Sequence, residues 1–269
     1  MKRSWFASPY AMWMLLFTIA PMIFVVIYAM TDSTGIFTME NLMSVSGPVY
    51  MKVLWRSLYL ALGCTAICLL LGYPTAYFLA SKDFAKNQTL FVLILLPMWM
   101  NFLLRTYAMM SLMEDNGIIN TFLKSLGLQP LKMIGTEGAV LVGMVYNYLP
   151  FMVLPIHTTL KKMDRRVIEA AEDLGANPFE VFRRVTLPLS VPGIISGVTM
   201  VFMPAVTTFA ISRLLGSGNF MLYGDMIEKQ FLELNNWNFG SSLSLLMMVL
   251  CVVSIGILNR ADPKQRGGA

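Results

Sequence analysis

Six long apolar stretches, separated by short polar segments, run along almost the whole chain. A helix needs about 20 mostly apolar residues to cross a hydrocarbon layer about 30 Å thick. The stretches at 11–30, 57–80, 90–112, 139–157, 192–211 and 240–258 meet that length. Lipid offers no partners to backbone N–H and C=O groups, so each stretch is expected to be a helix. The pattern predicts an all-α protein with six transmembrane helices.

Composition supports a single transmembrane domain over residues 1–269. The chain is 57% hydrophobic and 13% charged, with a mean hydropathy of +0.64, whereas soluble domains are about 25% charged. Lys2 and Arg3 precede the first stretch, as they would in a signal peptide. Its apolar run exceeds the usual 7 to 15 or so residues of such a peptide, so we interpret it as an uncleaved first span.

The distribution of Lys and Arg predicts that both termini lie in the cytoplasm, because cytoplasmic segments are enriched in these residues. With this orientation thirteen of the 20 are cytoplasmic: Lys2, Arg3, Lys82, Lys86, Lys161, Lys162, Arg165, Arg166, Arg183, Arg184, Arg260, Lys264 and Arg266. Six lie in outer segments, and Arg105 lies within the third span. The basic pI follows from this bias and does not call for a nucleic-acid partner.

The segment 158–191, between the fourth and fifth spans, has the pattern of two short helices. Asp164 is placed to cap the first helix, and Gly175 occupies its C-terminal stop position. Asn177, Pro178 and Glu180 fit the N-cap, N1 and N3 positions of the second helix. We expect Pro188 and Pro192 to end that helix before the fifth span.

Phe179 and Phe182, three residues apart, are expected to form an apolar edge that faces away from the bundle. Helices of about ten residues are marginal in water, so tertiary or partner contacts must stabilise this segment. The alternative is a solvated cytoplasmic loop.

This segment also resembles a family signature. Glu169-Ala170-Ala171, Gly175 and Leu187-Pro188 match the spacing of the EAA motif of binding-protein-dependent ATP-binding cassette (ABC) importer permeases, with Val185 where the family often has Ile. The resemblance implies a MetI-like permease fold whose cytoplasmic coupling loop docks on an ATPase subunit. The coupling residues it implies are Glu169, Ala170, Ala171, Gly175, Asn177, Pro178, Phe179, Phe182, Leu187 and Pro188.

Four further stretches resemble the PotB-type permeases of spermidine and putrescine importers. They are LGYPTAYFLA, LPMWMNFLLRTYAMM, VYNYLPFMVLP and EKQFLELNNWNFGSSLS. The resemblance implies a transport subunit in a bacterial cytoplasmic (inner) membrane. Its implied partners are an ABC ATPase dimer, a second, PotC-like permease and an extracytoplasmic polyamine-binding protein.

The chain itself lacks the G-x-x-x-x-G-K-[ST] loop that cradles nucleotide phosphates. We therefore expect no catalytic residue and no cofactor here, with ATP and Mg²⁺ bound by the partner ATPase. Permeases for another small organic solute, ion-coupled carriers and membrane enzymes are the alternatives. His157 stands without a ligand cluster, and Cys64, Cys68 and Cys251 suit apolar packing, so no metal site is expected.

The six stretches contain no Asp or Glu, although a polyamine would cross between them as a cation. Aromatic rings attract desolvated ammonium groups, so Trp99, Tyr107, Tyr146 and Tyr148 are candidates for the substrate pathway, Trp99 first. The alternative for each is packing or placement at the membrane interface. Arg105 is expected to point away from the pathway or to be paired. The outer loops 31–56, 113–137 and 212–239 are candidates for receiving the binding protein.

Overall fold

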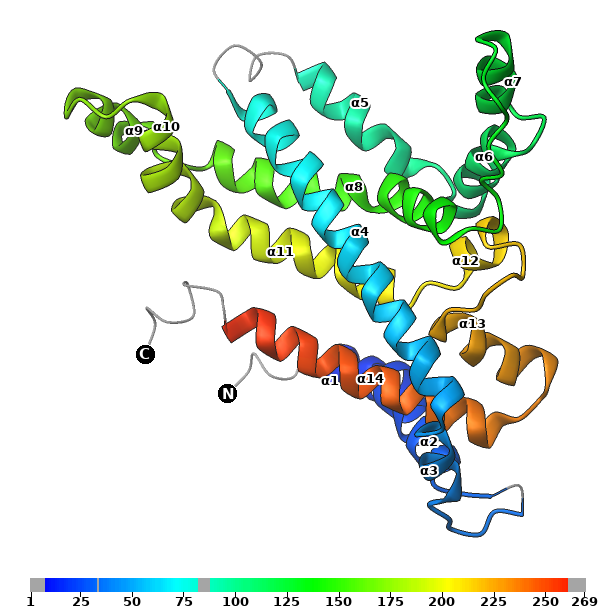
Figure 1. The fold of residues 1–269 in the computed structure, drawn as a ribbon. Coiled ribbons are helices and arrows are strands. Elements are labelled where there is room, and N and C mark those ends of the chain that lie inside the picture. Colours follow the sequence, from blue (N-terminus) through cyan, green and yellow to red (C-terminus); the bar gives the residue numbers. More distant parts are fainter. Residues whose placement is uncertain (1–7, 33, 82–87, 261–269) are drawn as a thin grey trace.

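The computed structural model describes residues 8–32, 34–81 and 88–260, and this part of the chain is almost entirely helical (Figure 1). Besides helices it contains one isolated bridge, between Thr31 and Phe37. The long elements that hold the spans are α2 (Ala20–Ala29, continuing α1, Ser8–Met14, and η2, Leu15–Ile19), α4 (Pro48–Ala80), α5 (Gln88–Trp99), α6 (Phe102–Met113), α8 (Glu137–Lys161), α11 (Leu187–Val206) and α14 (Trp237–Arg260).

Shorter helices connect them: α3 (Glu40–Val45), α7 (Ile118–Ser125), α9 (Arg165–Asp173), α10 (Pro178–Val181), η3 (Phe182–Thr186), α12 (Ala210–Leu215), α13 (Tyr223–Glu228) and η4 (Lys229–Glu233). In the described part of the chain five helices are long and apolar enough to span a membrane, and a bent helix pair makes six if it is counted as one span. The all-α membrane fold expected from the sequence is confirmed.

Helices α4, α8 and α11 form the centre of the bundle, and small residues allow them to approach closely (Figure 1). A Cβ atom on Gly72 of α4 would lie 2.9 Å from Cγ of Met152, and one on Gly197 of α11 would lie 2.7 Å from its Sδ. Met152 of α8 is itself fully buried. The core therefore depends on one large side chain that fits between two glycines. Helix α2 packs against α14 beside this core.

The third predicted span, 90–112, is not one straight helix. Helices Thr89–Trp99 and Phe102–Ser125 meet at a bend of 97°. Asn101 interrupts the helix with an extended ψ of 130° and caps α6, since its side chain accepts hydrogen bonds from the amides of Leu103 and Leu104. The Arg105 guanidinium donates to the Pro97 carbonyl across the bend at 2.8 Å. The predicted span took no account of Asn101 and Arg105, because the run is long and mostly apolar around them.

The prolines that were expected to end the second loop helix do not end it. One helix runs from Pro178 to Thr207, through α10, η3 and α11. Pro188 has no N–H to bond with the carbonyl four residues earlier. Around it the helix takes a π register, in which the Leu187 amide bonds to the Phe182 carbonyl. The loop helix is therefore continuous with the fifth span, which begins earlier than the predicted Pro192.

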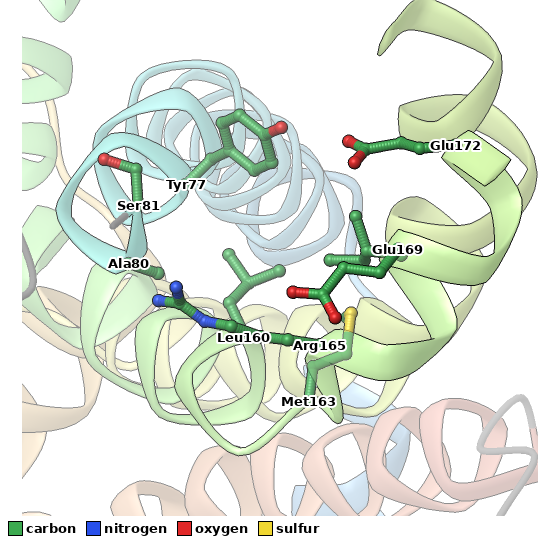
Figure 2. A pocket seen from close by; sticks show the side chains of 9 residues that line it. Tyr77, Ala80, Ser81, Leu160, Met163, Arg165, Glu169 and Glu172 are labelled. Atoms are coloured by element: carbon green, nitrogen blue, oxygen red, sulfur yellow. The ribbon is translucent and has the colours of Figure 1, made fainter. Parts of the chain in front are cut away.

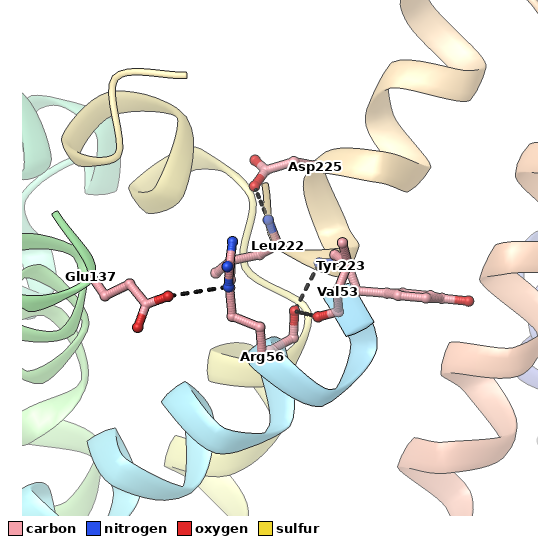
Figure 3. A network of polar contacts seen from close by, with 7 residues as sticks. Val53, Arg56, Glu137, Leu222, Tyr223 and Asp225 are labelled. Carbon is pink, nitrogen blue, oxygen red and sulfur yellow. Dashed lines mark hydrogen bonds and ion pairs between the residues drawn. The ribbon is translucent and has the colours of Figure 1, made fainter. Parts of the chain in front are cut away.

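On the opposite side of the bundle from α9 and α10, the connection between α11 and α14 folds back onto α4 and α8 (Figures 1 and 3). The Tyr223 amide donates to Ser57 Oγ at 2.8 Å, and Arg56 pairs with Glu137 at 3.1 Å. Burial raises the pKa of Asp225 to about 6, although the Leu222 amide and the Ser212 hydroxyl stabilise its carboxylate. Helices α12, α13 and η4 occupy much of the segment 212–239, which the sequence analysis treated as a loop.

Candidate functional site: the segment between α8 and α11

The turn between α9 and α10 is fixed by local hydrogen bonds that the sequence predicted. Asp164 caps α9 by accepting from the Arg166 amide at 3.0 Å. Gly175 has a φ of +83°, the left-handed conformation that glycine adopts without strain. Its amide bonds to the Glu172 carbonyl, and the Ala176 amide bonds to the Ala171 carbonyl. This pair of bonds is a Schellman motif, and it ends α9.

The start of α10 is fixed by a capping box, also as predicted. Asn177 Oδ1 accepts from the Glu180 amide at 2.9 Å, and Glu180 Oε2 accepts from the Asn177 amide at 3.1 Å. Pro178 occupies the first helical turn. Two different stop and start signals therefore stand within six residues and leave the turn little conformational freedom.

This rigid turn carries two exposed apolar side chains. Leu174 is 89% exposed and Phe179 is 68% exposed. Helices α9 and α10 project from the end of the bundle where α4 ends and α8 ends (Figure 1). Large apolar side chains on a polar, projecting segment typically mark a contact with another protein. The arrangement offers an apolar surface that a partner can bind.

Phe182 does not face outward with Phe179. Its ring packs edge-on against Tyr73 and Tyr77 of α4, with centroid distances of 5.9 and 5.6 Å. The expectation of a common outward edge is therefore wrong for Phe182. The helix continues through η3 into α11, so Phe182 lies where the loop joins the bundle. Phe182 is half-buried, and the neighbouring Val181 and Thr186 are buried.

Glu169 and Glu172 lie on the side of α9 that faces α4 (Figure 2). They border a cavity of about 270 Å³ together with Tyr77, Ser81 and Leu160, among others. Glu169 of the EAA motif therefore faces the cavity and not the side of the exposed Leu174 and Phe179. The remaining loop candidates are placed as follows: Ala170, Gly175, Asn177, Pro178, Leu187 and Pro188 are exposed, and Ala171 is half-buried.

The four aromatic candidates for a substrate pathway are not gathered around one cavity. Trp99 ends α5 and is 82% exposed, and Tyr107 is exposed on α6. Tyr148 is buried and its hydroxyl donates to the Pro204 carbonyl at 3.3 Å. The face of the Tyr146 ring is covered by the Arg105 guanidinium, 6.0 Å from its centroid.

Arg105 is paired, as expected, although its partner is the Pro97 carbonyl. Its guanidinium is buried within a span, where such a charge is costly and usually has a structural or transport role. Because this cation covers Tyr146, an ammonium group cannot use the same ring face in this conformation.

Sequence reasoning missed Tyr73, Tyr77 and Ser190. The hydroxyls of Tyr73 and Ser190 lie 2.9 Å apart and are buried. Tyr73 and Tyr77 are four residues apart and therefore share one face at the end of α4. This spacing was the available signal, but the sequence does not reveal which segment packs on that face.

Comparisons with known proteins agree with this architecture. Residues 69–267 match the family model "Binding-protein-dependent transport system inner membrane component". The chain is 38% identical over 258 residues to the spermidine/putrescine transport system permease protein PotB of Haemophilus influenzae, covering 93% of this chain and 90% of that protein. It is 35% identical over 258 residues to PotB of Escherichia coli K12, covering 93% and 94%.

The fold is also that of a chain in the crystal structure of a bacterial ABC transporter involved in the import of the acidic polysaccharide alginate. The TM-score is 0.77 at 16% identity, over 96% of this chain and 95% of that one. This likeness concerns the fold alone. The family match and the two relatives show that the chain belongs to the binding-protein-dependent transport system inner membrane component family, as a transport permease subunit of an ABC importer.

Proposed function

We propose that this chain is one membrane-spanning subunit of an ATP-driven importer for polyamines such as spermidine and putrescine. The substrate assignment is supported by the two PotB relatives, which are similar over nearly their full length. We further propose that an extracytoplasmic binding protein delivers the substrate and that a second, PotC-like permease completes the pathway.

The segment 158–191 is proposed as the coupling loop that docks on the ATPase. The observation that carries this proposal is the pair of exposed apolar side chains, Leu174 and Phe179, beside a turn that hydrogen bonds hold rigid. Burying a large apolar side chain stabilises a contact by about 1.5–3 kcal/mol. A rigid apolar tip can enter a groove on the ATPase without losing much conformational entropy on binding.

Docking on the cytoplasmic ATPase places α9, α10 and the inner end of α4 in the cytoplasm, and with them both termini. The basic residues Arg165, Arg166, Arg183 and Arg184 of this segment fit that side, because cytoplasmic loops are enriched in Lys and Arg. ATP and Mg²⁺ are then bound by the ATPase dimer, and this chain converts its movement into transport.

The test is to purify the tagged permease with its partner subunits and to measure both ATPase copurification and uptake of labelled spermidine and putrescine in proteoliposomes. Leu174→Asp and Phe179→Asp should lower copurification at least several-fold. Leu70→Ala is the matched control, since Leu70 is exposed on α4, 73% exposed, and outside the proposed docking surface.

Each alternative function gives a different result in this experiment. Copurification without spermidine or putrescine uptake would assign the importer to another small organic solute. Uptake that needs no ATP and collapses with a protonophore would indicate an ion-coupled carrier and would contradict the proposal.

A further inference from the structure

Three rings from two distant segments form one cluster at the inner end of α4. We call Tyr73, Tyr77 and Phe182 the aromatic joint. Both tyrosine rings meet Phe182 close to perpendicular, at interplanar angles of 79° and 84°. Edge-to-face contacts of this kind are directional, so they resist sliding better than aliphatic packing of equal area.

The backbone changes register at the same point. Phe182 is the first residue of η3, and its carbonyl accepts the π-type bond from the Leu187 amide. Single π turns inside α-helices are frequent at functional positions. On the N-terminal side of Phe182 the helix carries Phe179 of the proposed docking surface, and on the C-terminal side the same helix becomes the fifth span.

A second contact fastens the two helices two turns further into the bundle. The Tyr73 hydroxyl lies 2.9 Å from Ser190 Oγ, and Ser190 in turn donates to the Leu187 carbonyl at 2.8 Å. Ser190 is fully buried. Helices α4 and α11 are therefore joined both at the ring of Phe182 and at the hydroxyl of Ser190.

The other side of the loop is not packed in this way. Between α9 and α4 lies the cavity of about 270 Å³, to which Tyr77 also contributes (Figure 2). A displacement of α9 can be taken up in that space, whereas a displacement of α10 moves Phe182 directly against two rings. Close-packed side chains transmit a displacement to their neighbours, whereas a void allows a side chain to move without displacing them.

We propose that Phe182 is a positioning residue that transmits movement of the docking surface to α4. On this view Phe179 binds the ATPase, while Phe182, three residues later, connects the loop to the bundle. The inference rests on the proposed function, because it assumes that an ATPase moves the loop. It assigns to the aromatic joint the step between ATPase movement and rearrangement of the spans.

The test uses the complete transporter in proteoliposomes with spermidine, and it measures spermidine imported per ATP hydrolysed. Phe182→Ala should leave ATPase copurification unchanged and lower this ratio by about tenfold, the order expected when two aromatic contacts are lost. Phe182→Tyr should retain most of the ratio because it keeps the ring.

Tyr77 provides a second, partly exposed position for the same measurement, at 44% exposure. Tyr77→Ala should lower the ratio, whereas Tyr77→Phe should preserve it, since the contact needs the ring and not the hydroxyl. If Phe182→Ala fails to reach the membrane, this pair decides the question. Phe179→Ala is the matched control on the same helix, and it should lower copurification without changing the ratio in the complexes that form.

An unchanged ratio in both Phe182→Ala and Tyr77→Ala would overturn the inference. So would loss of copurification in Phe182→Ala at a normal ratio, because Phe182 would then belong to the docking surface. A wild-type permease that copurifies no ATPase would instead refute the proposed function, which keeps the two failures distinct.

Discussion

Gly175 sets the angle between the two loop helices, because it alone adopts the left-handed backbone conformation that the turn between them requires. Its φ is +83°, and a Cβ built on it meets nothing within 4 Å. A replacement is therefore disfavoured by backbone strain and not by a clash. For a residue with a Cβ this conformation costs about 1–2 kcal/mol, which is enough to reorient α10 but too little to unfold a six-span bundle.

Gly175→Val should accordingly reach the membrane at a normal level and lose coupling, seen as reduced ATPase copurification or as ATP hydrolysis without uptake. Gly175→Asn should be tolerated, since Asn adopts left-handed conformations more readily than other non-glycine residues. The measurements are membrane protein level, copurification and spermidine uptake. Full uptake with normal assembly in Gly175→Val would contradict the docking role.

Trp99 remains the first candidate for contact with the substrate in this chain. It stands at the bend of the third span with 82% of its surface exposed, so the described part of the chain leaves its ring largely uncovered. The face of an aromatic ring attracts a desolvated ammonium by about 2 kcal/mol. Trp99→Leu should lower polyamine uptake several-fold at a normal protein level, and Trp99→Tyr should keep most of it. Equal uptake by all three proteins would remove Trp99 from the pathway.

Of two helical segments that contain prolines, one stays continuous and the other is interrupted. The helix through Pro188 and Pro192 continues, and at Pro188 the adjacent π turn η3 accommodates the missing hydrogen bond. The third span, with Pro97, breaks at Asn101, because Asn101 can cap a new helix and Arg105 can bond to the Pro97 carbonyl. The third span thus breaks where a capping side chain and a charged donor can satisfy the freed backbone groups.

Arg105→Met should loosen the bend of the third span, since it leaves the Pro97 carbonyl without its charged donor at a cost of about 1–3 kcal/mol. Spin labels at Leu93 and Leu104, both exposed, would report the distance between α5 and α6. We expect a broader and longer distance distribution in Arg105→Met, together with reduced uptake. An unchanged distribution would show that Asn101 alone fixes the bend.

Local signals made the loop predictable from sequence, and tertiary contacts made other features unpredictable. Asp164, Gly175 and the Asn177–Glu180 pair act on backbone groups within a few residues, so their roles could be read directly. The orientation of Phe182 depends on Tyr73 and Tyr77, more than one hundred positions earlier. The bend of the third span depends on the hydrogen bond from Arg105 to the Pro97 carbonyl, eight residues earlier. Hydrophobic periodicity does not report such a contact.

In the whole molecule, the bundle separates two sets of short helices. Helices α9 and α10 project at one end, and α12 and α13 fold back over the other (Figure 1). The proposed function assigns the first end to the cytoplasm and to the ATPase, and the second to the binding protein. Docking, coupling and the direction of transport all depend on this assignment.

Site-specific labelling tests this assignment. It uses single cysteines at Asp173, beside the docking surface, and at Gln129, in the loop proposed to lie outside, after Cys64, Cys68 and Cys251 are replaced. Both positions are exposed, and neither carries the capping interactions that hold the turn. A membrane-impermeant maleimide should label Gln129→Cys in intact cells and Asp173→Cys only after the membrane is opened. Labelling of Asp173→Cys should then fall sharply when the purified ATPase is bound. Labelling of Asp173→Cys from outside, or equal labelling with and without the ATPase, would contradict the account.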